Sequence, residues 1–81
     1  MQAGAYAHAE IMATDICVWV GRRIRVLRTQ RGWTQQILAD HAAITREHLS
    51  ELENGRKESG IKTIERISTA LGLSLKDFFD K

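Results

Sequence analysis

The stretch that decides the fold is residues 34–53, TQQILADHAAITREHLSELE. Apolar side chains recur in it at three- and four-residue spacing, in two short groups, and a threonine stands before each group. Thr34 and Thr45 are good N-caps, because a threonine hydroxyl accepts a hydrogen bond from a backbone N–H of the first helical turn. The pattern predicts two helices joined by three or four residues, which must cross at a steep angle.

The two expected helices differ in what their outer faces carry. Ala39 is small where the helices approach each other, and Ile44 fills the space beneath the turn. The expected core residues are Ile37, Leu38, Ala39, Ala42, Leu49 and Leu52. The exposed face of the second helix is expected to carry Arg46, Glu47, His48, Ser50 and Glu51. Such a mixture of long donors and acceptors is suited to reading base edges in a DNA major groove.

Three more helices are expected around this pair, and capping residues and glycines mark their ends. The expected boundaries are Thr14 or Asp15 to Gly32, Ser59-Gly60 to Gly72, and Ser74 onward, with Asn54-Gly55 ending the helix that Thr45 begins. The expected inward residues are Ile16, Val20, Ile24, Leu27 and Arg31, then Ile61, Ile64, Ile67, Ala70 and Leu71, and last Leu75, Phe78 and Phe79.

Length and composition limit the chain to one small domain. It has 81 residues, a formal net charge of +2 and 43% hydrophobic residues, which is enough for a single core. The absence of proline and the small number of aromatic residues, without alternating β-branched runs, argue against an all-β fold. We therefore predict an all-α domain of five helices over residues 14–81, preceded by a flexible, alanine-rich arm at residues 1–13.

The same composition excludes several classes of protein. A lone Cys17 forms no internal disulfide, and no apolar run is long enough to span a membrane. The opening MQAGAYAHAE lacks the features of a signal peptide, so we expect a cytoplasmic protein. His8, His41 and His48 have no zinc-like spacing, and there is no catalytic set or phosphate-binding glycine loop. We expect no enzyme activity, metal, cofactor or small-molecule ligand.

Four segments together resemble the phage-repressor and Cro-like helix-turn-helix regulators, the XRE family. The matching segments are 24–28 (IRVLR), 34–39 (TQQILA), 52–56 (LENGR) and, in the fourth helix, Ile67 with 70–73 (ALGL). The resemblance covers residues 20–79 and implies a five-helix, lambda-repressor-like domain that regulates transcription by sequence-specific binding to double-stranded DNA. The short chain also resembles the controller proteins of restriction–modification systems.

The resemblance implies roles for single residues. Gln35 matches a residue that hydrogen-bonds phosphate, and Thr45 and Arg46 match the first positions of the recognition helix. Arg46 is the expected base reader, because a guanidinium can pair bidentately with guanine O6 and N7. The other expected DNA contacts are Glu47, His48, Glu51, Asn54 and Arg56. Arg28 and Glu53 match a partly buried ion pair that ties the first helix to the third.

Two positions depart from the family pattern. Ala43 stands in the turn where the family usually has glycine, and a positive φ there would cost alanine about 1 kcal/mol. Residues 56–60, RKESG, lack the usual proline, which predicts a looser loop. Residues 20–57 nevertheless hold eight basic and four acidic side chains, so positive charge is concentrated around the two helices expected to contact DNA.

A homodimer on a palindromic or near-palindromic operator is the expected working form. One small domain does not readily bury all the apolar side chains of the C-terminal third, and we expect Ile61, Leu75 and Phe79 to meet a partner. Trp19 covers a partner or the arm, or stays partly exposed, and Arg22-Arg23 contacts phosphate or is a solvated face. The same fold also serves as a protein-interaction module or an antitoxin, and this alternative stays open.

Overall fold

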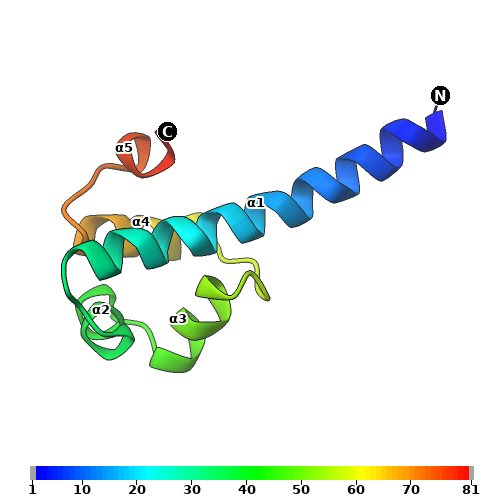
Figure 1. Ribbon diagram of the computed structural model, residues 1–81. Coiled ribbons are helices and arrows are strands. Elements are labelled where there is room, and N and C mark those ends of the chain that lie inside the picture. Colours follow the sequence, from blue (N-terminus) through cyan, green and yellow to red (C-terminus); the bar gives the residue numbers. More distant parts are fainter. Residues whose placement is uncertain (1, 81) are drawn as a thin grey trace.

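The computed structural model describes the backbone of residues 2–80 and the side chains of residues 16–80. These residues form five helices and no strand: α1 (Gln2–Gln30), α2 (Gln35–Ala42), α3 (Arg46–Glu53), α4 (Ile61–Ala70) and α5 (Leu75–Phe79). In Figure 1, α2 and α3 lie on one side of α1, and α5 lies on the other. The arrangement confirms the predicted all-α fold class.

The short helices begin where the sequence predicts. The hydroxyl of Thr34 accepts a hydrogen bond from the backbone N–H of Ile37 at 3.2 Å, and that of Thr45 accepts one from His48 at 3.0 Å. Ser74 caps α5 in the same way. Each cap satisfies a backbone donor that has no partner within its own helix.

One core joins the five helices. Its buried side chains are Ile24, Leu38, Ala39, Ala42, Leu49, Leu52, Ile64, Ile67, Leu71 and Phe78. All ten come from positions at helical spacing, and α2 packs against both α3 and α4 while α1 packs against α3. Because α2 and α3 both contribute to this core, the orientation of α3 is set by tertiary packing as well as by the turn before it.

Three isoleucines that the sequence places in the core are exposed, and so are Arg31 and Phe79, which it also places on inward faces. Ile16, Ile37 and Ile61 keep 57%, 39% and 63% of their surface accessible. Ile37 precedes Leu38 in an eight-residue helix, and only the face of Leu38, Ala39 and Ala42 is covered. Ile16 and Ile61 face an open groove instead of the core. These assignments are wrong because periodicity locates an apolar face but not how far the packing extends around it.

The predicted start of the first helix is also wrong. No cap interrupts the chain at Thr14 or Asp15, because α1 is continuous from Gln2 to Gln30. Alanine is the strongest helix former, and the alanine-rich residues 2–13 continue the helix away from the other four, as Figure 1 shows. Met1 and Lys81 lie outside the described residues, and the expected flexibility of an arm at residues 1–13 stays a prediction.

Aromatic and arginine side chains attach α5 to α1. The ring of Trp19 stacks on Phe79 with centroids 5.9 Å apart and meets Phe78 edge-on at 6.3 Å. Arg23 donates from Nε to the carbonyl of Phe78 at 2.9 Å and from Nη2 to that of Asp77 at 3.0 Å. Carbonyls at a helix C-terminus lack partners within the helix, so a guanidinium is well suited to bind them. Arg23 is therefore occupied within the fold.

Candidate nucleic-acid interface

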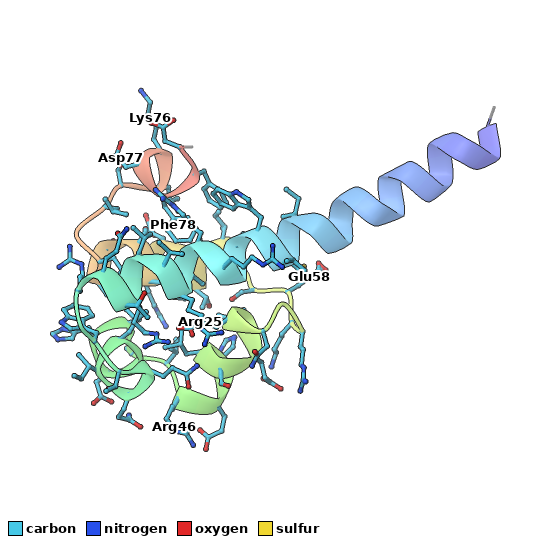
Figure 2. The ribbon with its side chains drawn as sticks, in the orientation of Figure 1. Arg25, Arg46, Glu58, Lys76, Asp77 and Phe78 are labelled. Atoms are coloured by element: carbon cyan, nitrogen blue, oxygen red, sulfur yellow. The ribbon has the colours of Figure 1, made fainter. Side chains whose placement is uncertain are left out.

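The first turn of α3 carries an exposed pair of opposite charges. The side chains of Arg46 and Glu47 are exposed, and Figure 2 shows Arg46 at the bottom of the view, pointing away from the other helices. Glu47 in the first turn is favourable to the helix dipole, and Arg46 has no ion pair among the residues with described side chains. A long donor and a long acceptor thus project together from the end of a short, well-anchored helix.

Thr45 and Gln35 stand at the N-termini of α3 and α2. The Thr45 oxygen accepts the capping bond from His48, which leaves its hydroxyl hydrogen free to be donated outward. Gln35 is half-buried, and its Nε2 donates to Glu53 Oε1 at 3.2 Å. Helix N-termini present unpaired backbone N–H groups that favour phosphate, so both residues occupy positions suited to an anionic backbone.

The far end of α3 supplies three of the expected contacts. Glu51 pairs with Lys57 at 3.5 Å, but both side chains are 52% exposed, so the pair contributes little and leaves Glu51 accessible. Asn54 is exposed and donates from Nδ2 to the carbonyl of Ser50 at 2.9 Å, while Arg56 is exposed in the loop. These side chains lie at the opposite end of α3 from Arg46.

His48 is less available than its place on the outer face of α3 predicts. Its side chain is half-buried, and its Nε2 is enclosed with no hydrogen-bond partner among the described residues. The expectation of a freely exposed histidine beside Arg46 is therefore wrong. Ser50, expected on the same face, is half-buried as well. The exposed part of this face thus narrows to Arg46, Glu47 and Glu51.

The turn between α2 and α3 contains the positive φ that was expected at Ala43, where the family usually has glycine. Ala43 has φ 58° and ψ 43°, in the left-handed region, and it is the non-glycine residue with a positive φ among those described. The left-handed conformation is unfavourable for an L-residue with a Cβ. The chain accepts this cost because the backbone N–H groups of Ala43 and Ile44 then close the end of α2 by bonding to Asp40 and Ala39 carbonyls.

Replacing Ala43 with glycine is expected to stabilise the domain by about 0.5 kcal/mol. Glycine removes the left-handed strain from the folded state, which raises the free energy of unfolding. It also raises the conformational entropy of the unfolded chain, which offsets part of that gain. Denaturant unfolding followed by circular dichroism measures the change. Ala42→Gly, in the buried last turn of α2, is the matched control and should destabilise; an equal gain in both variants would contradict the strain argument.

A buried ion pair holds α3 against α1. Arg28 Nε lies 2.7 Å from Glu53 Oε2 and Nη2 lies 3.0 Å from Oε1, so the contact is bidentate. Nη1 of Arg28 also donates to the Trp33 carbonyl at 2.7 Å. The Arg28 and Glu53 side chains are only 11% and 2% exposed. The pair expected from the sequence is thus present, and it joins α1, the α1–α2 turn and the last residue of α3.

Gly21 brings the backbones of α1 and α3 together, and sequence reasoning missed it. A Cβ at this position would meet the carbonyl oxygen of Leu52 and lie 2.8 Å from that of Glu53. Only a residue without a side chain permits this approach. The signal in the sequence was a glycine in the middle of a predicted helix, which costs stability unless packing requires it.

The residues expected at a dimer interface divide between two environments. Ile61 and Phe79, which is 44% exposed, line an apolar groove of about 580 Å³ together with Ile16, Cys17 and Val20. Leu75 is instead half-buried and packs against the core of its own chain. Exposed apolar surface therefore concentrates where α1, α4 and α5 meet, and Leu75 contributes little to it.

No helix among the described residues is both long enough and apolar enough to cross a bilayer. Trp33, which sequence reasoning placed at the corner of the first two helices, is half-buried and stacks on His41 of α2 with centroids 4.7 Å apart.

Comparison with known proteins identifies the arrangement. A family model described as a helix-turn-helix domain matches residues 21–81. The control protein C.BamHI of Bacillus amyloliquefaciens is 31% identical over 70 residues, which are 85% of this chain and 86% of that protein. The competence pilus inhibition repressor of Acinetobacter baylyi is 37% identical over 60 residues, 74% of this chain. The chain spans only 54% of that repressor's length.

Solved structures agree with the sequence comparison. The restriction–modification controller protein C.AhdI from Aeromonas hydrophila matches with a TM-score of 0.77 at 29% identity, covering 80% of this chain and 98% of that one. The two relatives of this chain named above are transcriptional regulators by name. The match to the helix-turn-helix family model spans α2, α3 and the Arg28–Glu53 pair. The chain therefore belongs to the helix-turn-helix family of DNA-binding transcriptional regulators, alongside XRE-type repressors and restriction–modification controller proteins.

Proposed function

We propose that this regulator binds a palindromic operator as a homodimer and reads its sequence with α3. The observation that carries the proposal is the exposed Arg46–Glu47 pair at the start of a helix that is packed into the core. The Thr45 cap orders the first turn of α3, the apolar face of the helix is buried in the core, and the Glu53–Arg28 pair ties its last residue to α1. A reading helix must keep its side chains in register with base edges, and such anchoring limits how far it can tilt.

Each exposed group has a chemical partner in DNA. The Arg46 guanidinium donates to guanine O6 and N7, and Glu47 accepts from a cytosine N4 amine. Gln35 and Thr45 bind phosphate at the helix N-termini and set the register of the domain on the backbone. Asn54 and Arg56 contact the phosphate backbone past the end of α3, with Glu51 near the sugar–phosphate edge.

The proposed dimer rests on the apolar groove. A second chain that covers Ile61 and Phe79 removes exposed apolar surface that a monomer leaves in water. Two-fold pairing places the two α3 helices in successive major grooves, about 34 Å apart. A single domain offers few base contacts, so two copies also supply useful specificity.

Selection of bound sequences from a random pool of DNA duplexes tests the proposal directly. We expect enrichment of an inverted repeat whose half-sites are about one helical turn apart. Enrichment of a single half-site would contradict the dimer. No enrichment at all would contradict sequence-specific binding and favour a protein-interaction module or an antitoxin of the same fold.

Replacing Arg46 with alanine should cost about 1–3 kcal/mol at the selected site and relax the preference at one base pair. The matched control is Lys76→Ala, which removes a positive charge from α5 at the opposite end of the view in Figure 2. Lys76→Ala should leave the ratio of specific to scrambled binding unchanged. An unchanged ratio for Arg46→Ala as well would show that Arg46 does not read a base.

Replacing Phe79 with aspartate should convert the protein to a monomer and weaken operator binding while leaving helix content intact. A carboxylate in the proposed interface would be desolvated without a partner. Sedimentation at micromolar concentration measures the mass. Val26→Asp is the control, because Val26 is 48% exposed but lies outside the groove of Phe79. A wild-type monomer that binds a half-site as tightly as the full palindrome would contradict the dimer.

A further inference from the structure

The Glu53 carboxylate does more in this structure than pair with Arg28. It accepts three hydrogen bonds, two from Arg28 at 2.7 and 3.0 Å and a third from Nε2 of Gln35 at 3.2 Å. The third bond joins Glu53, the last residue of α3, to Gln35, the first residue of α2. The buried pair is therefore connected directly to Gln35, one of the side chains that we propose contact the DNA backbone.

A carboxylate is acceptor-only, so it determines which way the Gln35 amide turns. The amide nitrogen must face Glu53, because the amide oxygen in that place would meet a like partial charge. The nitrogen carries two hydrogens, and one hydrogen bond uses only one of them. The second hydrogen has no partner among the described residues, and it belongs to the same atom that Glu53 holds in place.

The place of Gln35 at the start of α2 suits a contact with a phosphate. Gln35 is the first residue of α2, where backbone N–H groups lack partners within the helix, and the N–H of Ile37 is already taken by the Thr34 cap. Arg28 pairs with Glu53 and offsets the negative charge that would otherwise repel the DNA backbone.

We propose that Glu53 is a positioning residue for DNA binding, which orients the Gln35 amide so that its second N–H meets a backbone phosphate. This inference rests on the proposed function. Glu53 touches no DNA itself and acts through Gln35 alone. A glutamine in its place can present either an oxygen or a nitrogen to Gln35, and the selection of one amide orientation is then lost.

A double-mutant cycle on DNA affinity tests the coupling. Affinity is measured for a short mixed-sequence duplex, because a phosphate contact is independent of sequence. Gln35→Ala should bind about tenfold more weakly, since it loses a hydrogen bond to a charged acceptor. Glu53→Gln should weaken binding in the same direction, and the double variant should be no weaker than Gln35→Ala. Losses that multiply would overturn the proposal and leave Glu53 a purely structural residue.

Nuclear magnetic resonance of the wild-type chain gives a readout that does not depend on Glu53→Gln folding. The side-chain amide of Gln35 is identified by its absence from the spectrum of Gln35→Ala. Before DNA is added, one Nε2 proton should already differ from free-amide values, and DNA should shift the other. Wild-type binding with both protons unmoved overturns this inference alone. Absence of wild-type binding to any duplex overturns the proposed function with it.

Discussion

Replacing Arg28 with methionine is expected to lower the free energy of unfolding by about 3–5 kcal/mol, because it leaves the Glu53 carboxylate buried without its counter-charge. The carboxylate side chain is 2% exposed, so water does not replace the lost guanidinium. The Trp33 carbonyl loses its donor at the same time. Thermal and denaturant unfolding, followed by circular dichroism, measure the change.

Glu53→Gln and the double variant complete the comparison. Each single change leaves one buried charge uncompensated, while the double change removes both charges. The double variant should therefore lose less stability than the two single variants together. Strictly additive losses would show that the Arg28 and Glu53 side chains do not interact in solution.

Replacing Gly21 with alanine is expected to cost about 1–3 kcal/mol or more, although alanine is the better helix former. The added Cβ would collide with the carbonyl oxygens of Leu52 and Glu53, which are backbone atoms that move only if α1 and α3 separate. Separation would also stretch the Arg28–Glu53 contact, which spans the same two helices. The midpoint of urea unfolding measures the loss.

Gly60→Ala is the matched control for this prediction. A Cβ at Gly60 meets nothing within 4 Å, and φ there is −65°, which any residue adopts. The change should alter stability by less than about 0.5 kcal/mol, because a poorer N-cap and a less flexible unfolded chain act in opposite directions. Equal losses at Gly21 and Gly60 would show that close approach of α1 and α3 is not the cause.

The local features of this fold could be predicted from the sequence. The starts of α2, α3 and α5 followed from the hydroxyls of Thr34, Thr45 and Ser74, and the buried face of α2 followed from Leu38 and Ala39. These features depend on residues within one helical turn of each other. The pairing of Arg28 with Glu53 followed instead from the family resemblance, because nothing in spacing alone relates residues so far apart in the chain.

The features that the sequence did not reveal depend on contacts between distant segments. Arg23 bonds to carbonyls of α5 some fifty residues later, and its neighbours in sequence do not distinguish it from a solvated arginine. Ile16 and Ile61 fit the apolar period of their helices, yet both face an open groove. The burial of His48 Nε2 likewise depends on how α3 packs against the rest of the fold.

The burial of the Arg28–Glu53 pair has a consequence for how the protein responds to ionic strength. Dissolved ions weaken interactions that pass through water over about 10 Å at 0.1 M salt, and they act much less on buried pairs. The side chains of Arg46 and Arg56, which we propose contact DNA, are exposed to solvent, whereas the pair that anchors α3 is buried. Rising salt should thus release the protein from DNA while its reading helix stays in place, so the regulator leaves its site folded and ready to bind again.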